Sequence, residues 1–234
     1  MTLSYLDNSA TTPLCPAASE KMKAVMEQTF GNPSSLHNLG MEAEKAVSEA
    51  RDKIFTALGA KKAGKVKPQM LVFTASGTEA NNLALIGAAT AKERRRGGKI
   101  IVGETEHPSV TETAKYLSTI GYRVAFIPSP RGVWDMEKYK AELTADTILV
   151  SAMLVNNETG AINDIAAISA LAKAKNPDVI VHCDAVQGFL KLPEPLAALP
   201  ADLITVSSHK ICGPKGVGAL FVREKVLQDR KSVV

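Results

Sequence analysis

The segment VSSHKICGPKGVGALFV, Val206–Val222, joins the end of one apolar run to the start of another through a lysine and a glycine-rich turn. The first run, Ala201–Val206, has the composition of a buried strand, yet it leads directly into SSHK (207–210). Because the connecting turn is too short for a crossover helix, we expect the two flanking strands to be antiparallel. A lysine at the end of a buried strand needs an explanation, since lysine is rarely buried.

Upstream of this segment, short apolar runs alternate with amphipathic stretches from about residue 70 onward. This alternation predicts βαβ units and an α/β fold with a mostly parallel seven-stranded sheet, helices on both faces and one antiparallel strand. The expected strands are Met70–Ala75, Lys99–Gly103, Arg123–Ile127, Thr147–Val155, Val179–Asp184, Leu203–Val206 and Val217–Val222. The expected helices are Pro16–Thr29, Met41–Leu58, Glu79–Arg95, Ser109–Ile120, Met136–Leu143 and Asp164–Ala174. We divide the chain into an N-terminal helical segment, 1–60, and a larger domain, 61–234.

The composition favours a globular protein of the cytoplasm. The chain has 234 residues, of which 45% are hydrophobic and 22% charged, and its net charge is only +4. The basic residues are scattered, so we expect no nucleic-acid partner. No apolar run approaches the roughly 18 residues of a membrane span, and the N-terminus lacks the pattern of a signal peptide. Three cysteines without CxxC spacing favour a reducing compartment and predict no metal site.

Polar residues follow most of the expected strands at their carboxyl ends. In open parallel sheets, ligands bind beyond this edge. The residues concerned are Gly77 and Thr78 after the first strand, His107 after the second, Asn157 after the fourth, Asp184 and Gln187 after the fifth, and Ser207, His209 and Lys210 after the sixth. Because amine, imidazole, carboxylate and amide groups converge on one edge, we expect a ligand site there.

Each of these residues also has a purely structural interpretation. The Ser76-Gly77-Thr78 turn would serve as a helix cap, His107 as a cap or core residue, and Asp184 as an N-cap. Asn156 and Asn157 are typical turn residues, and Lys210 alone would be a solvated loop residue. The structural interpretations would all have to hold at the same sheet edge, so the ligand site is the stronger hypothesis.

The chemistry of this set points to pyridoxal 5′-phosphate (PLP). A glycine-threonine turn at a helix start binds phosphate. Asp184 would hold a pyridinium nitrogen, and a desolvated Lys210 would form a Schiff base with an aldehyde. His107 would stack on the ring and move protons, while Asn157 and Gln187 would bind a phenolic oxygen. The GPKGVG run (213–218) is no P-loop, and no GxGxxG follows the first strand.

Seven motifs in matching order extend this reading over essentially the whole chain. They are YLDNSATTP (5–13), GNPSSLH (31–37), FTASGTEANN (73–82), TEH (105–107), VNNETG (155–160), HCDAVQ (182–187) and SSHKICGPKGVGAL (207–220). In these motifs the chain resembles the cysteine desulfurases of the class V aminotransferase superfamily, in particular the NifS/IscS-like branch. The resemblance implies the large domain of the PLP-transferase fold type I.

The resemblance also implies a role for each site residue. Lys210 would bind PLP covalently and move the substrate α-proton, and His107 would stack on the ring and act in acid–base chemistry. Asp184 would pair with the ring nitrogen, and Gln187 and Asn157 with its phenolic side. The phosphate would be held by the remaining four candidates, Gly77, Thr78, Ser207 and His209.

The implied reaction converts L-cysteine into L-alanine and a persulfide on an enzyme cysteine. The sulfur would then pass to an acceptor or scaffold protein for iron–sulfur clusters or thio-modification. Family members are homodimers and carry a C-terminal small domain with the nucleophilic cysteine and a carboxylate-binding arginine. We expect this domain to be absent from a chain that reads as truncated at Val234.

None of the three cysteines is a strong substitute for that nucleophile. Cys183 adjoins Asp184 on a strand and should face the core. Cys212 lies on a glycine-bounded turn near Lys210, and Cys15 precedes Pro16 at a helix start, where the helix dipole favours reactivity. Two other readings stay open. One is a non-catalytic fragment of a PLP domain, and the other is a different class V enzyme such as a selenocysteine lyase.

Overall fold

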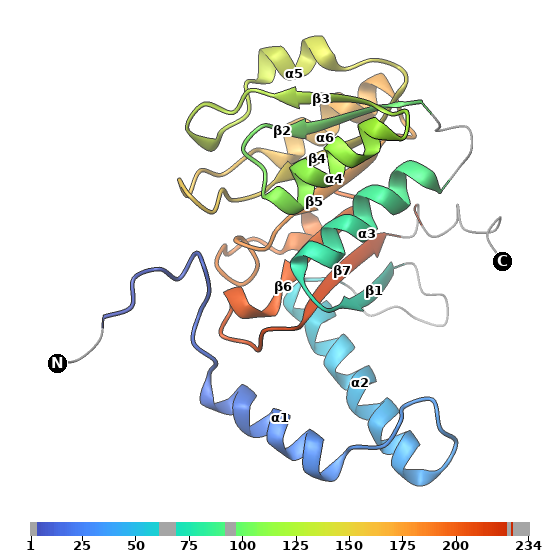
Figure 1. Cartoon of the computed structure of the whole chain (residues 1–234), viewed down its shortest axis with the longest axis vertical. Helices are drawn as coiled ribbons and strands as arrows, with labels where there is room; N and C mark the ends of the chain where they lie inside the picture. Colours follow the sequence, from blue (N-terminus) through green and yellow to red (C-terminus); the bar gives the residue numbers. More distant parts are fainter. Residues whose placement is uncertain (1–3, 61–68, 92–96, 224–225, 227–234) are drawn as a thin grey trace.

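The computed structural model describes residues 4–60, 69–91, 97–223 and 226, which form one seven-stranded sheet flanked by helices (Figure 1). The spatial order of the strands is β1-β7-β6-β5-β4-β2-β3. Their bounds are β1 Gln69–Thr74, β2 Lys99–Gly103, β3 Arg123–Ile127, β4 Thr147–Met153, β5 Ile180–Asp184, β6 Leu203–Ser207 and β7 Gly218–Arg223.

The sheet is parallel except at β7, which runs antiparallel to both of its neighbours. Ser207 at the end of β6 pairs with Gly218 at the start of β7, so the SSHK turn and the glycine-rich loop form one tight connection. The prediction of a mostly parallel seven-stranded sheet with one antiparallel strand is confirmed. β4, β5 and β6 are buried along their whole length, as expected for central strands covered on both faces.

Helices cover both faces of the sheet. α3 and α4 pack on one face through a core that includes Leu85 and Leu117. α6, α5 and the end of α2 pack on the other, around Ile168, Tyr139 and Leu58. The helix bounds are α1 Pro16–Gln28, α2 Asn38–Ala57, α3 Gly77–Thr90, α4 Pro108–Thr119, α5 Met136–Glu142 and α6 Ile165–Lys175, with 3₁₀ turns at Pro130–Gly132, Leu196–Ala198 and Ser208–Lys210.

Several elements differ from their predicted bounds, and two of the differences have a clear cause in the structure. α2 begins at Asn38 rather than Met41, because the ring of His37 accepts a hydrogen bond from the Gly40 N–H and caps the helix. β4 ends at Met153 rather than Val155, since Val155 pairs with Ile162 across the VNNETG turn. The predicted end of the helix 79–95 and the boundary at 60/61 fall on or next to 92–96 and 61–68, outside the described residues.

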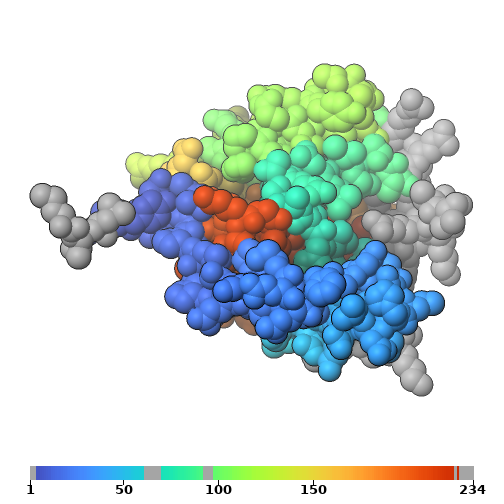
Figure 2. Space-filling view, turned by 60° about the horizontal axis from the view of Figure 1, so that its bottom comes forward, coloured from blue at the N-terminus to red at the C-terminus, as the bar shows by residue number. Residues whose placement is uncertain are grey.

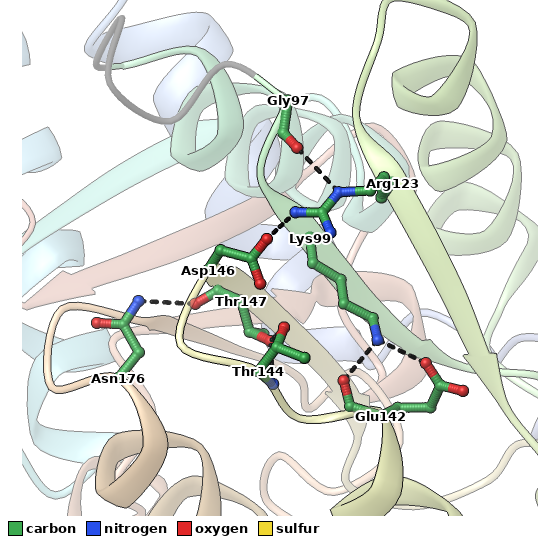
Figure 3. A network of polar contacts seen from close by, with 8 residues as sticks. All are labelled: Gly97, Lys99, Arg123, Glu142, Thr144, Asp146, Thr147 and Asn176. Atoms are coloured by element: carbon green, nitrogen blue, oxygen red, sulfur yellow. Dashed lines mark hydrogen bonds and ion pairs between the residues drawn. The ribbon is translucent and has the colours of Figure 1, made fainter.

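A polar network joins the strands at the amino edge of the sheet, opposite the predicted site (Figure 3). Lys99, at the start of β2, donates to both the carbonyl and the carboxylate of Glu142 at 2.6 Å. Arg123, at the start of β3, pairs with Asp146. Asn176 donates to the carbonyl of Thr147 at 2.9 Å. These contacts hold the connections that lead into β2, β3 and β4 at the amino edge. None of them involves a residue at the carboxyl edge.

α1 and the first half of α2 lie away from the sheet (Figure 1). α1 has no buried residue, and apolar side chains on or between the two helices are exposed, namely Met22, Met26, Phe30, Leu36, Leu39 and Met41. Among the described residues, no helix has both the length and the apolarity to cross a bilayer. Within the same residues, no three His, Cys, Asp or Glu side chains gather as a metal-binding group.

Candidate active site

One cavity of about 540 Å³ opens at the carboxyl edge of the sheet. It contains all nine residues singled out from the sequence. They are Gly77, Thr78, His107, Asn157, Asp184, Gln187, Ser207, His209 and Lys210. These residues come from α3, from the loops after β2 and β4, and from β5, β6 and the segments that follow them. The sheet therefore brings together groups spread over more than half of the chain, as the parallel topology predicts.

The first turn of α3 forms one wall of the cavity. Ser76 caps the helix by accepting from the Glu79 N–H at 3.1 Å, and Glu79 in turn accepts from the Ala75 N–H at 2.6 Å. These two contacts, which resemble a capping box, fix a helix start whose first amides have no intrahelical acceptor. A Cβ at Gly77 would lie 3.3 Å from the Cβ of Ser207, so glycine lets the helix start approach β6 closely. Backbone N–H groups at this helix start would suit an anion such as a phosphate.

Asp184 lies at the floor of the cavity and is 3% exposed. Its Oδ2 accepts from the Asn81 amide at 2.8 Å, and its Oδ1 accepts from the Val186 N–H at 3.0 Å. Burial raises the pKa of Asp184, whereas these two hydrogen bonds and the charges of His107 and Lys210 oppose the rise. The carboxylate is thus available inside the cavity for a cationic ring nitrogen.

A chain of hydrogen bonds connects Asp184 to His107. The Nδ2 of Asn81 donates to Asp184 and also to the Oγ of Ser109, at 2.9 Å. The Oγ of Ser109 lies 2.7 Å from His107 Nδ1, which also accepts the Ser109 N–H at 3.1 Å. Since Nδ1 accepts the amide, a neutral His107 carries its proton on Nε2. His107 therefore caps α4 and lines the cavity at once.

Lys210 extends from the 3₁₀ turn after β6 to the N-terminal segment. Its Nζ donates to the backbone carbonyls of Ser9 at 2.5 Å and Ala10 at 2.7 Å. Burial lowers the pKa of Lys210, and the positive charge of Lys191 lowers it further. Figure 2 shows the N-terminal segment in blue lying against the orange-red segment that contains this turn. A larger neutral fraction makes Lys210 a better nucleophile than an ordinary lysine.

Gln187 is held at both ends of its amide. Its Nε2 donates to the Ser9 carbonyl and its Oε1 accepts from Lys191, each at 2.7 Å. The Nδ1 of His209 lies 3.0 Å from the Oγ1 of Thr11. Burial lowers the pKa of His209, and the nearby lysines lower it further. Of the two asparagines, Asn156 holds the turn by accepting from the N–H groups of residues 158 and 159, while Asn157 lines the cavity.

The donors and acceptors of the cavity match the groups of PLP. The α3 start, Ser207 and His209 would take the phosphate, and Asp184 would take the ring nitrogen. The amine of Lys210 would take the aldehyde. The Oδ1 of Asn81 is buried without a hydrogen-bond partner among the described residues, so polar capacity remains beside Asp184. The chemical groups that line the cavity would thus suit the phosphate, the ring nitrogen and the aldehyde of PLP.

Three features of the site were not predicted. Asn81 lies four residues after Gly77, so it shares a helix face with the start of α3. This spacing could have identified Asn81 as a site residue from the sequence. Ser109 follows His107 by two residues and orients its ring. The carbonyls of Ser9 and Ala10 carry no sequence signal, because backbone acceptors do not depend on residue type. Of the cysteines, Cys183 is fully buried in the core, as expected, while Cys212 is exposed and Cys15 half-buried.

Comparison with known proteins identifies the family of this chain and several relatives. The family model of class-V aminotransferases matches residues 4–233. A cysteine desulfurase IscS from Methylobacillus flagellatus is 44% identical over 223 residues, covering 94% of this chain and 53% of the relative. The chain thus spans about half the length of the curated relatives it matches.

Solved structures give the same result for the fold. A NifS-like protein superposes with a TM-score of 0.88 at 37% identity, over 95% of this chain and 60% of the other. A structure described as SspA in complex with cysteine gives a TM-score of 0.82 at 33% identity, over 94% of this chain and 61% of the other. Both superpositions cover nearly the whole of this chain.

Proposed function

Because the chain belongs to the class-V aminotransferase family, we propose that it forms the PLP-binding part of a cysteine desulfurase. The observation that carries this proposal is the cavity in which the Lys210 amine, the buried Asp184 carboxylate and the α3 N-terminus meet. The similarity to IscS and NifS-like proteins, and a related structure described as a complex with cysteine, support L-cysteine as the substrate.

In this proposal each residue acts on a distinct part of the reaction. PLP supplies, when bound, an electron sink for negative charge on the α-carbon of an amino acid. Lys210 would hold the cofactor and would move the α-proton, for which its lowered pKa suits it. Asp184 would hold the ring nitrogen in its protonated form, and Asn81 keeps Asp184 in place. His107 presents its Nε2 proton, since Ser109 occupies Nδ1.

The proposal extends to the whole protein as follows. The sulfur of L-cysteine passes as a persulfide to an acceptor or iron–sulfur scaffold protein, and the enzyme works as a cytoplasmic homodimer. A selenocysteine lyase would use the same cavity, so substrate preference has to be measured. The comparison is between L-cysteine and L-selenocysteine, with formation of L-alanine as the common readout.

The test of cofactor binding is a PLP titration followed by absorbance, with Lys210→Ala against Lys215→Ala. Lys215 borders a neighbouring cavity and lies outside the cavity of Lys210, which makes it a matched control. We expect the protein and the Lys215→Ala variant to shift the cofactor spectrum, and Lys210→Ala to leave it close to that of free PLP. Equal spectra for both variants would refute the assignment of Lys210.

A further inference from the structure

Cys15 and Cys212, near opposite ends of the described chain, lie side by side. The backbone N–H of Cys15 donates to the carbonyl of Cys212 at 2.9 Å. Standard bond lengths across one N–H···O=C hydrogen bond place the two Cα atoms no more than about 7 Å apart. Disulfide-bonded cysteines usually have Cα atoms about 4.4–6.8 Å apart. The backbone therefore holds the two residues at bridging distance.

Thr12 fixes the register of the two segments. Its N–H and its Oγ1 each donate to the carbonyl of His209 at 2.9 Å. The same Oγ1 accepts from the N–H of Cys212 at 2.7 Å. Together with the bond from Cys15, these contacts pair residue 12 with 209 and residue 15 with 212. Two anchor points three residues apart restrict how far the cysteines can separate.

Both thiols are accessible for chemistry. Cys212 is exposed and Cys15 half-buried, and Cys15 makes no side-chain capping bond at the start of α1. The amine of Lys191 lies within electrostatic reach of Cys212. Cys183, in contrast, is 0% exposed and packed in the core. Of the three cysteines, only Cys15 and Cys212 are both accessible to solvent and next to another cysteine.

We propose that Cys15 and Cys212 form a reversible disulfide, with a low-molecular-weight disulfide as the oxidant. The Cys212 thiolate attacks one sulfur of the oxidant, which breaks the S–S bond and releases one thiolate. The Cys15 thiolate then attacks the sulfur of Cys212 and releases the second. The two protein thiols lose two electrons and two protons, and the oxidant leaves as two thiols. An excess of dithiol reverses both steps.

The bridge would fasten the N-terminal segment to the turn that carries Lys210. The same segment supplies the carbonyls of Ser9 and Ala10 that bind the Lys210 amine. Oxidation would therefore hold this segment on the edge of the cavity, whereas reduction would let it move. The bridge needs no cofactor, so it is testable whether or not the protein binds PLP.

The experiment exposes the reduced protein to oxidised glutathione and follows its intact mass and its non-reduced tryptic map. We expect a loss of about 2 Da, the two hydrogens removed, that dithiothreitol reverses. The peptides Met1–Lys21 and Ile211–Lys215 should appear as one linked species, with Cys183 still free. The bridged form should also melt at least roughly 5 °C higher, because the bridge closes a long loop.

Cys15→Ser and Cys212→Ser serve as separate variants, each checked for native circular dichroism. Each should abolish the linked peptide and the rise in melting temperature, and each should leave one mixed disulfide with glutathione. Two stable mixed disulfides on the unsubstituted protein, or a bridge only between two chains, would overturn the proposal. So would a linked species that contains Cys183.

Discussion

Asn81 and Asp184 are joined by a 2.8 Å hydrogen bond at the floor of the cavity, from an amide on α3 to a carboxylate at the end of β5. Both side chains are almost fully buried. The second hydrogen of the same amide goes to Ser109, which contacts His107. One asparagine thus connects the residue proposed for the ring nitrogen to the residue proposed for acid–base chemistry.

Asn81→Ala should weaken PLP binding by about five- to thirtyfold, the equivalent of about 1–2 kcal/mol. The hydrogen bond from Asn81 lowers the pKa of Asp184, so its removal raises that pKa and reduces the charge offered to a protonated ring nitrogen. Titration with PLP at pH 7 measures the effect. Asn82→Ala is the control, because Asn82 contacts Thr113 instead. Equal losses in the two variants would contradict a specific role for Asn81.

Lys191→Met should shift the formation of a Lys210 adduct to higher pH. Lys191 lowers the pKa of Lys210 by charge repulsion, so its loss raises the pKa of Lys210 and delays the neutral amine. The rate of adduct formation with PLP between pH 6 and pH 10 gives the midpoint. Lys191→Arg retains the charge and should restore the profile, and Lys215→Met should leave it unchanged. A midpoint that moves down or stays fixed in Lys191→Met would show that this charge does not act on Lys210.

Glu106→Gln should make stability less dependent on pH. Burial raises the pKa of Glu106 well above its usual value, so the folded protein binds a proton there that the unfolded chain has released. Stability is therefore lost as pH rises through the folded pKa. The variant should melt higher than the unsubstituted protein at pH 8, on a scale of about 2–4 °C per kcal/mol, and differ less at pH 5.

The Glu106→Gln substitution removes the titratable group but keeps the hydrogen bond that Glu106 makes. Glu106 accepts from the Met153 N–H at 2.6 Å, and the amide oxygen of glutamine preserves that acceptor. The exposed neighbour Glu104→Gln is the control and should melt like the unsubstituted protein at both pH values. A Glu106→Gln variant that melts lower at pH 8 than at pH 5, relative to that control, would contradict the assigned direction.

Lys99→Met should lower the free energy of unfolding by about 1–2 kcal/mol, because two hydrogen bonds to Glu142 are lost at a site where the lysine side chain is only 14% exposed. Lys115→Met removes a solvated pair with Glu112 and should cost less than about 0.5 kcal/mol. Urea unfolding compares the two. A larger cost at Lys115 would mean that the amino-edge network contributes little.

The bounds of strands and helices were predictable where the apolar runs of the sequence have clear ends. β2 and β3 match their predicted bounds because each apolar run starts after a charged residue, Lys99 or Arg123, and stops at Gly103 or Pro128. The end of β4 was misplaced, since Leu154 and Val155 continue the apolar run although the VNNETG turn has already begun. The start of α2 was missed because histidine is an uncommon cap, and only the ring of His37 reveals it.

The site was predictable in its side chains and unpredictable in its backbone. Parallel topology alone was enough to bring Thr78, His107 and Asp184 to one edge. No pattern links Lys210 to the carbonyls of Ser9 and Ala10, some 200 residues away along the chain. The pairing of Cys15 with Cys212 is of the same kind. Both depend on where the N-terminal segment packs, which local periodicity does not encode.

The most direct measurement is peptide mapping after borohydride reduction of the protein with PLP. A modified lysine resists trypsin, so an adduct on Lys210 places the cofactor mass on the uncut peptide Leu192–Lys215. Our account predicts that this peptide carries the adduct and that Lys210→Ala lacks it. A protein without any adduct, or with adducts scattered over surface lysines at the same level in Lys210→Ala, would contradict the proposal that this cavity binds PLP.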